Sequence, residues 1–501
     1  MRAGKIFSGQ TMRWVRGLVA SLLVLLMTAP AFAQSVATAP VAAAASQAAA
    51  ASTAVATAPA AAPTPPWYAT SYDTGSTAWM LAATALVMIM MPGLALYYGG
   101  IVRRKNFLAT MITSYSALGV IVVQWFLFGY MLAFAGPTIG TTPLIPWLAP
   151  YIGWDPSRLL MWCGPNTLVS PGGAPIPETI FNMFQAMFAV ITPALIAGSI
   201  AERMKYGAWC LFIFLWGTLV YDPLAHFIWG GGWLSTLGAV DFAGGTVVHI
   251  SSGVSGLVAA IMIGKRLGYP GQGVIQPNSL FNTLTGAGLL WFGWYGFNAG
   301  SANAANPLAC TAFLNTTVAT AMAGMAWNFA EWMHHRRATT LGIASGFVAG
   351  LVAITPACGY VTMWSSLIIG ALAGVVCYGG AQLKTIFGYD DALDAFGVHA
   401  IGGFLGAMLT GVFASQIINP AGPNGAIYGN WKQLWYQFLA ASDAVVVAAV
   451  GTAIIIVVLD KTIGLRVPEE VEIEGLDLGL HGEVGYDTGS AASVALPGGM
   501  T

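Results

Sequence analysis

Apolar residues occur along this chain in long stretches with few interruptions, from about residue 74 to about residue 460. Each stretch is about 20 residues long, enough for an α-helix to cross a hydrocarbon layer of about 30 Å. The pattern predicts an all-α integral membrane protein with eleven transmembrane helices. The predicted ranges are 76–100, 107–134, 178–201, 206–227, 246–264, 279–300, 308–333, 339–356, 359–383, 395–417 and 434–459.

The basic residues give an independent test of this count. Of 18 Lys and Arg, four lie in the first 16 residues, which leaves 14. Twelve of these 14 follow odd-numbered ranges, and only Arg158 and Lys432 lie on the other side. By the positive-inside rule, the N-terminus is therefore outside and the C-terminus is in the cytoplasm.

The eleven ranges divide into two sets of five and one extra helix at the C-terminal end. Because five is an odd number, the second set is expected to be inverted relative to the first. We therefore predict two inverted five-helix repeats plus one C-terminal helix. In transporters of this kind the site lies at the repeat interface, near the middle of the membrane.

The two ends of the chain differ from the transmembrane part, 75–463. Residues 1–33 have the basic start, apolar centre and Ala31-Phe32-Ala33 pattern of a cleavable signal peptide, although a retained first helix is the alternative. Residues 34–74 are rich in Ala and Pro and are expected to form an extracytoplasmic linker. Residues 464–501 are expected to form a cytoplasmic tail.

Composition supports a membrane protein and argues against several other classes. Hydrophobic residues make up 57% of the chain and charged residues only 7%, against about 25% charged residues in soluble domains. The net charge of −1 and the lack of a basic patch argue against a nucleic-acid partner. The five Cys show no CxxC spacing, so we interpret them as small core residues. No cofactor or metal is predicted.

Only two of the six histidines, His249 and His399, lie well inside apolar ranges; His226 is at the outer end of the fourth range, where a structural hydrogen bond is expected. Each is near the start of the last range of its repeat, so the two imidazoles are expected to meet inside the membrane. An ionisable group there indicates a functional site. Neutral imidazoles could pass a small uncharged polar molecule or relay a proton. A packing role and a metal site are the alternatives, but no further buried His or Cys is placed to complete a metal site.

Aromatic residues gather near the expected outer mouth. Aromatic faces attract cations, and a hydroxyl can accept a hydrogen bond from one. These residues therefore suggest a cation-binding vestibule, with an interfacial aromatic belt as the alternative. The candidates are Phe184, Phe188, Trp229, Trp294, Phe297 and Ser301.

Two aspartates precede the histidine helices. Asp241 and Asp394 either bind cations or cap helix starts, and we favour capping or scaffold roles. Asp222 and Asp443 lie in apolar ranges, and the sequence assigns no role to either.

Long motifs in these regions resemble the ammonium transporters (the Amt/Mep/Rh family), specifically the bacterial Amt branch. The resemblance covers about residues 75–486. The matching stretches are PGLALYYGGIVRRKN (92–106), AGSIAERMKYGA (197–208), AHFIWGGGWL (225–234), GAVDFAGGTVVHI (238–250), GWYGFNAGSA (293–302), TPACGY (355–360), DAFGVHAIGG (394–403) and GLRVPEE (464–470).

The resemblance implies a role for each matched position. Phe188, Trp229 and Ser301 resemble an outer ammonium recruitment site, and Phe188 with Phe297 resembles a stacked phenyl gate. His249 and His399 resemble the paired pore histidines of the family. Asp241 is similar to the aspartate that shapes the outer site, and Asp394 is its scaffold counterpart in the second repeat. Phe184 and Trp294 are further pore aromatics.

The family also implies an activity and an assembly. Ammonium would be recruited outside, deprotonated on entering a dry pore and carried as ammonia, because desolvation disfavours the charged form of an amine. A homotrimer in the bacterial inner membrane is implied, with a PII-type signalling protein at the cytoplasmic face, where the tail from Gly464 resembles the segment involved.

Two departures from the family pattern and three competing functions stand beside this interpretation. Asp222 occupies a position where an apolar residue is expected, and the loop 135–177 is outside the recognised pattern. The competing functions are a neutral-gas channel, an ammonium sensor and a membrane enzyme. No nucleophile–base set supports an enzyme.

Overall fold

The computed structural model describes residues 71–161, 167–270 and 276–486. The predicted signal peptide (1–33) and nearly all of the predicted linker (34–74) lie outside the described residues, as does the end of the tail. Every element described below belongs to one compact unit, Pro66–Thr501.

Helices occupy each of the predicted ranges. In chain order they are α2 (Thr74–Met88), α3 (Met90–Ile101), α4 (Phe107–Gln124), α5 (Tyr130–Phe134), α6 (Glu178–Ile200), α7 (Tyr206–Trp216), α8 (Asp222–Ile228), α9 (Trp233–Leu237), α10 (Ser251–Ile263), α11 (Leu280–Gly300), α12 (Pro307–His335), α13 (Thr340–Ile354), α14 (Met363–Phe387), α15 (Ile401–Phe413), α16 (Trp431–Thr462), α17 (Glu469–Glu474) and α18 (Leu476–His481).

Shorter elements join or extend these helices. The π-helical turns are η2 (Trp125–Gly129), η5 (Gly217–Tyr221), η6 (Gly245–Ile250) and η7 (Phe396–Ala400). The 3-10 turns are η1 (Arg104–Asn106), η3 (Pro137–Ile139), η4 (Pro156–Met161) and η8 (Ala426–Tyr428). A small antiparallel sheet pairs β1 (Leu168–Val169) with β2 (Ile176–Pro177).

Nine helical stretches within the described residues are long and apolar enough to cross a membrane. They are Thr74–Ile101, Arg104–Phe134, Glu178–Ile200, Tyr206–Leu237, Gly245–Ile263, Pro307–His335, Met363–Phe387, Phe396–Phe413 and Trp431–Thr462. α13 is a shorter apolar helix, and α11 has 21 residues. The fold is therefore that of a mostly helical, multi-pass membrane protein.

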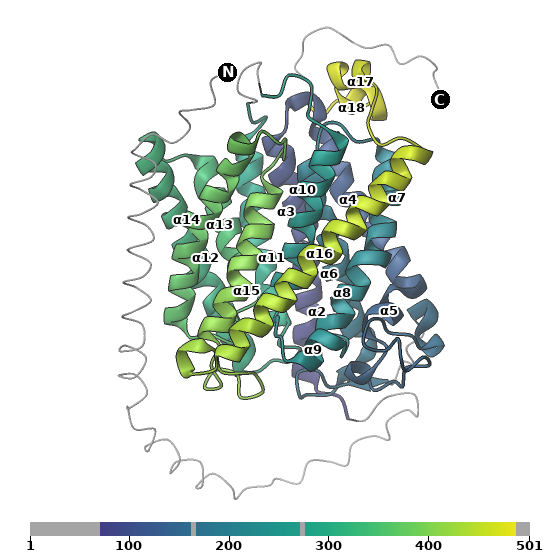
Figure 1. Cartoon of the computed structure of the whole chain (residues 1–501), viewed down its shortest axis with the longest axis vertical. Helices are drawn as coiled ribbons and strands as arrows, with labels where there is room; N and C mark the ends of the chain where they lie inside the picture. The colour runs from purple at the N-terminus through teal and green to yellow at the C-terminus, as the bar shows by residue number, and fades with distance from the viewer. Residues whose placement is uncertain (1–70, 162–166, 271–275, 487–501) are drawn as a thin grey trace, which may run out of the picture. The chain divides into compact units, whose positions relative to one another are not determined.

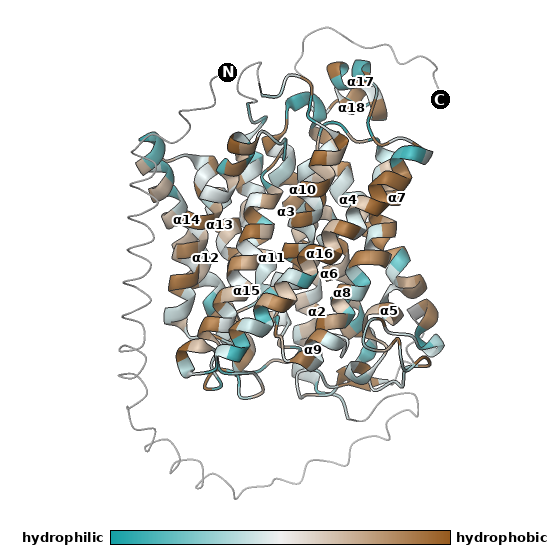
Figure 2. Cartoon of the chain, in the orientation of Figure 1, coloured by the Kyte–Doolittle hydropathy of each residue, from teal (hydrophilic) through white to brown (hydrophobic). Residues whose placement is uncertain are grey.

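The long helices run side by side in a bundle, and α16 crosses its surface obliquely (Figure 1). α17 and α18 lie at one end, which we call the tail end. The opposite end, which we call the loop end, carries α5, α9 and the described parts of the loop 135–177, which are 135–161 and 167–177. Hydrophobic residues dominate the middle of the bundle, whereas hydrophilic residues gather towards its ends (Figure 2).

Polar side chains fix where several long helices begin. Asp73, Ser279, Asn306, Thr339 and Thr362 each precede a helix, and each side chain accepts a hydrogen bond from an amide of the first turn. These amides have no partner within the helix, so such a cap stabilises the helix by about 1 kcal/mol. The caps thus explain why these helices start at these residues.

Small residues allow neighbouring helices to approach closely, as is common inside membranes. A Cβ added at Gly346 of α13 would lie 2.8 Å from the Cα of Gly324 in α12. One added at Gly370 of α14 would lie 2.3 Å from the carbonyl oxygen of Ala319. The abundance of glycine in the sequence therefore has a direct packing cause.

A network of buried charges joins four inter-helix segments at the tail end. Glu202 is 3.0 Å from the guanidinium groups of both Arg103 and Arg266. Asp390 is 2.7 Å from Arg266, and the guanidinium of Arg203 donates to the carbonyl oxygen of Asp390. Arg203 and Arg266 therefore lie inside the protein, at 0% and 5% exposure, although they count as basic loop residues in the sequence.

Candidate functional site

The structure brings the two predicted histidines together in the interior of the bundle. His249 lies on η6 and His399 on η7, and their Nδ1 atoms are 3.3 Å apart. The ring centroids are 5.3 Å apart and the planes are nearly parallel, at 24°. Both side chains are buried. Two residues 150 positions apart therefore form a single pair.

A glycine four residues after each histidine allows this approach. A Cβ at Gly253 would lie 2.2 Å from the amide nitrogen of Ala400, the residue after His399. A Cβ at Gly403 would lie 2.8 Å from the carbonyl oxygen of Gly245 and 3.0 Å from the Cβ of His249. The shared His-x-x-x-Gly pattern is the sequence signal for this crossing.

Both histidines lie in π-helical turns, which are rare and occur frequently at functional sites. The amide of His249 donates to the carbonyl oxygen of Gly244, five residues earlier, at 3.0 Å. Gly244 has φ +113°, a conformation that side chains disfavour. His399 lies in the second such turn, Phe396–Ala400. Simple helical periodicity cannot predict these turns.

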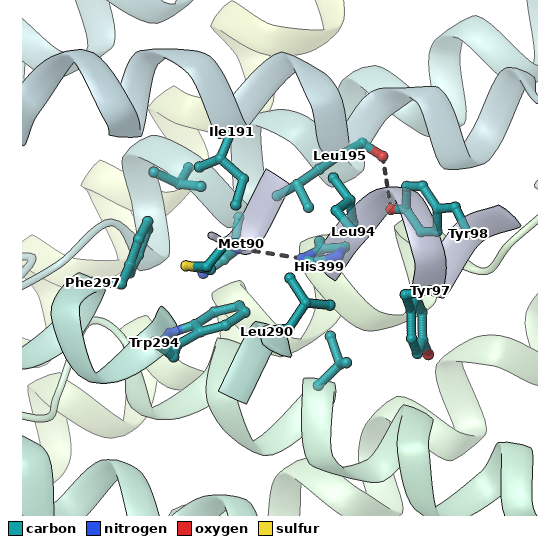
Figure 3. A pocket seen from close by; sticks show the side chains of 13 residues that line it. Met90, Leu94, Tyr97, Tyr98, Ile191, Leu195, Leu290, Trp294, Phe297 and His399 are labelled. Atoms are coloured by element: carbon teal, nitrogen blue, oxygen red, sulfur yellow. Dashed lines mark hydrogen bonds between the residues drawn. The ribbon is translucent and has the colours of Figure 1, made fainter. Parts of the chain in front are cut away.

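A narrow cavity adjoins the histidine pair, and its lining is mainly apolar (Figure 3). Figure 3 shows the rings of Trp294 and Phe297 on one side and Tyr97 and Tyr98 on the other. Among the described residues, no hydrogen-bond partner reaches the buried Nε2 of His249. The lining consists of Met90, Leu94, Tyr97, Tyr98, Ile191, Leu195, Val248, His249, Leu290, Trp294, Phe297, Val348 and His399.

Aromatic rings connect this cavity to the loop end. Phe188 and Phe297 are stacked, with centroids 4.1 Å apart and an angle of 17° between planes. Phe188 contacts Trp229 in an edge-to-face arrangement, with ring centroids 5.9 Å apart. Phe184 packs against Phe188 at 5.0 Å, and the hydroxyl of Ser301 donates to the carbonyl oxygen of Phe297 at 2.8 Å. The predicted aromatic residues thus form one continuous group.

Asp241 caps the helix that carries His249. Its carboxylate is buried and accepts hydrogen bonds from the four consecutive amides of residues 244–247, at 2.7–3.1 Å. Its carbonyl oxygen accepts from the indole N–H of Trp229 at 2.8 Å. One residue therefore holds both the histidine helix and the outer tryptophan.

Trp294 is held against His249 by residues that the sequence did not suggest. Its ring stacks on His249 at 5.4 Å and 20°. Its indole N–H donates to the hydroxyl of Thr355 at 2.9 Å, and that hydroxyl lies 3.3 Å from Oδ1 of Asn298. Thr355 belongs to the motif TPACGY, but no local signal connects it to Trp294.

The helix start that carries His399 is capped differently from the one that carries His249. The side chain of Asp391 accepts from the amide of Phe396 at 2.8 Å. Asp394 instead lies 2.7 Å from Nζ of Lys384 and has φ +60°. Burial raises the pKa of the Asp394 carboxyl above its ordinary value, and Lys384 opposes this shift. Asp394 is thus an ion-pair partner, and Asp391 provides the cap.

The two aspartates without a sequence assignment differ in their surroundings. Oδ2 of Asp222 accepts a hydrogen bond from the side-chain amide of Gln124 at 2.6 Å, which joins spans two and four. Oδ1 of Asp222 is buried and has no described partner. One oxygen of the half-buried Asp443 is also without a partner among the described residues. Among the described residues 71–161, 167–270 and 276–486, no cluster of His, Cys, Asp and Glu could hold a metal ion.

Comparisons with known proteins match nearly the whole described chain. The model of the Ammonium Transporter Family matches residues 78–486. An ammonium transporter of Aquifex aeolicus is 48% identical over 83% of this chain and 94% of its own length. The crystal structure of Saccharomyces cerevisiae Mep2 superposes with a TM-score of 0.72 at 34% identity, over 80% of this chain and 89% of that one. A sensor Amt protein gives a TM-score of 0.71 at 25% identity, over 81% of this chain and 98% of that one.

Proposed function

Because the chain belongs to the ammonium transporter family, we propose that it transports ammonium through the cavity beside His249 and His399. The observation that carries this proposal is the order of the groups. Trp229 contacts Phe188, Phe188 stacks on Phe297, and Phe297 lies 6.1 Å from His249. This order provides a cation-attracting surface, then an apolar constriction, then a pair of imidazoles.

Recruitment of ammonium is assigned to Phe188, Trp229 and Ser301. Aromatic faces attract a cation by about 0.5–2 kcal/mol, more when water is excluded. The hydroxyl of Ser301 donates to a carbonyl, so its lone pairs are available to an ammonium N–H. Asp241 supports the site through its bond to Trp229 and is not itself a ligand, because four amides occupy its carboxylate.

We expect ammonium to lose its charge at the gate formed by Phe188 and Phe297. Beyond this gate the cavity is lined mainly by apolar side chains, where an unpaired charge is very unfavourable. Ammonium would therefore lose a proton and continue as ammonia. The imidazoles offer N–H donors and lone pairs to a neutral molecule without adding a fixed charge.

The membrane topology belongs to the same proposal. We assign eleven spans, arranged as two inverted sets of five plus α16, with the loop end outside and the tail end in the cytoplasm. The location would be the bacterial inner membrane, after removal of the signal peptide 1–33 and with the linker 34–74 outside. The order of the helices and the basic residues near the tail end support this orientation.

A homotrimer and a PII-type partner complete the proposal. The exposed apolar face of α12 includes Phe313, Met325 and Phe329, at 43–62% exposure. This face suits contact with lipid or with another subunit. The tail, through α17 and α18, lies at the end where a cytoplasmic signalling protein would bind.

Electrical recording on reconstituted protein tests the proposed function. Ammonium and methylammonium gradients are expected to produce currents, and an equal potassium gradient is expected to produce none. A large potassium current would contradict deprotonation at the gate. Ammonia flux without any current would indicate a neutral-gas channel instead.

A proton relay through the two histidines has its own test. An H249D variant is expected to keep ammonia flux but lose most of the current, because a fixed carboxylate interrupts transfer between the two rings. The measurement compares current with pH-monitored ammonia uptake in the same proteoliposomes. Unchanged proton coupling in a variant that lacks both histidines would rule out the relay.

A sensor function is the second candidate, because a sensor Amt protein is among the similar structures. A sensor of this kind is expected to bind ammonium with little transport. Normal binding together with negligible current and ammonia flux would favour it over transport.

A further inference from the structure

His226 lies three residues before Trp229, near the end of α8, and is buried. Both nitrogens of its imidazole face backbone carbonyl oxygens. Nδ1 is 3.0 Å from the oxygen of Ala133, and Nε2 is 2.8 Å from the oxygen of Ala149. The ring thus bridges the end of α5 and the loop 135–177.

The chemistry of these two contacts determines the protonation state that fits them. A carbonyl oxygen only accepts, and a neutral imidazole has only one N–H. Both hydrogen bonds therefore form only when the ring is the doubly protonated imidazolium. Ala133 is the penultimate residue of α5, where free carbonyls and the helix dipole favour a cation. A cation at such a place is stabilised by about 0.3–2 kcal/mol.

The same region holds Trp229 in place. The hydroxyl of Thr138 donates to the carbonyl oxygen of Trp229 at 2.7 Å. The amide of Trp233 donates to the carbonyl oxygen of Pro150 at 2.9 Å. The amide of Gly232 donates to the backbone carbonyl oxygen of His226, also at 2.9 Å. The loop is therefore attached on both sides of Trp229, and His226 joins the loop to α5.

We propose that His226 is a positioning residue for ammonium recruitment, acting through Trp229 as a proton-sensitive clamp. This inference rests on the proposed function. When the imidazolium loses a proton, one of the two carbonyl contacts is lost, and the turn that carries Trp229 is held less firmly. Ammonium recruitment then weakens, while the gate and the histidine pair deeper in the bundle are unchanged.

The charged groups around the ring have other partners. On α8, Asp222 lies one turn before His226 and accepts from Gln124. Towards α5 and the loop, Arg158 pairs with Glu178 at 2.8 Å, and Glu178 accepts from Tyr130. Asp155 accepts from the amide of Ser157. Towards η6, Asp241 accepts from four amides.

The test compares the wild type with H226Q and T138V, as reconstituted full-length protein at equal pH on both sides. The apparent KM for ammonium and the maximal current are measured between about pH 5.5 and pH 8, the range around the titration of an unperturbed histidine. The wild-type KM is expected to rise with pH by about tenfold, equivalent to one charged hydrogen bond of about 1.5 kcal/mol. The maximal current is expected to change little.

The two variants separate the clamp from general packing. Both N–H donors of a glutamine side chain are on one nitrogen, whereas the two carbonyl oxygens face different nitrogens of the imidazole, so the glutamine is expected to reach only one of them at any pH. H226Q is therefore expected to have a raised KM that does not vary with pH. T138V removes a neutral bond to the same turn, so its KM is expected to be raised but to keep the wild-type pH dependence. A wild-type KM that is constant with pH, or an H226Q profile parallel to the wild type, would overturn the proposal.

Amide hydrogen exchange of the segment 226–234 gives a readout that does not require transport. At about pH 5.5, protection corrected for intrinsic exchange is expected to be lower in H226Q than in the wild type, and the two are expected to converge near pH 8. Equal protection at both pH values would contradict the clamp. Absence of any ammonium current with the expected exchange pattern would instead refute the proposed function and leave the clamp intact.

Discussion

An Asp241→Ala variant is expected to lose most of its ammonium current and to unfold at a lower temperature than the wild type. The substitution removes the acceptor for the four consecutive amides at the start of η6. An orphaned buried donor costs about 1–3 kcal/mol, so the combined loss is expected to reach several kcal/mol. Because η6 carries His249, the helix start and the pore are expected to be disturbed together.

The measurement is ammonium current per amount of reconstituted protein, with the thermal midpoint measured in parallel. D241N provides a graded comparison, because an asparagine retains one acceptor oxygen but turns an NH2 group towards the other amides. The expected order of current and midpoint is wild type, then D241N, then D241A. D155A, on the exposed part of the loop, is the matched control and should behave as the wild type. A D241A protein with normal current and midpoint would show that the four amides need no cap.

An Asp390→Ala variant is expected to have the largest effect on stability at the tail end. Asp390 accepts three hydrogen bonds from Arg266, from its amide, Nε and Nη2, at 2.7–2.9 Å. Removing this carboxylate leaves the buried guanidinium of Arg266 with Glu202 as its partner in the network, and it removes the carboxylate that lies 3.9 Å from the buried guanidinium of Arg203. Breaking a buried ion pair from one side costs about 3–5 kcal/mol. The thermal midpoint in detergent measures the loss.

The same network predicts how stability changes with pH. Burial raises the pKa of the Asp390 carboxyl, but hydrogen bonds and charge from Arg266 outweigh burial and bring it below its ordinary value. A lowered folded-state pKa contributes stability that is full above the unfolded value, about 4, and is lost as the pH falls below it. The wild-type midpoint should therefore fall more steeply than that of D390N below about pH 4. R337A, which removes an exposed cation, is the control.

The long apolar ranges and the histidine pair could be predicted from the sequence because each depends on a strong local signal. A stretch of about 20 apolar residues indicates a span, and a buried ionisable residue indicates a site. The predicted inverted repeats then led to the expectation that His249 and His399 meet. In the structure the two imidazoles do lie side by side, whereas the roles of these histidines in transport are proposals.

Long-range polar contacts could not be predicted in the same way. Arg203 and Arg266 have the composition of exposed loop cations, and only the fold shows that Glu202 and Asp390 surround them. Asp222 had no assignment because its partner, Gln124, lies 98 residues away on another helix. Such pairs depend on how helices are arranged in space, which the pattern of a single helix does not specify.

The π-helical turns under His249 and His399 have a consequence for the length of the chain. The two imidazoles face each other from η6 and η7, which are both π-helical. Because such a turn holds one residue more than an α-helical turn, deleting one residue from it is expected to leave an α-helical turn, in which the histidine has a different position around the helix. The register of the histidine pair is therefore set by how many residues precede each ring as well as by which residues they are. Single-residue deletions in these turns, unlike substitutions, would separate the rings without changing any chemical group.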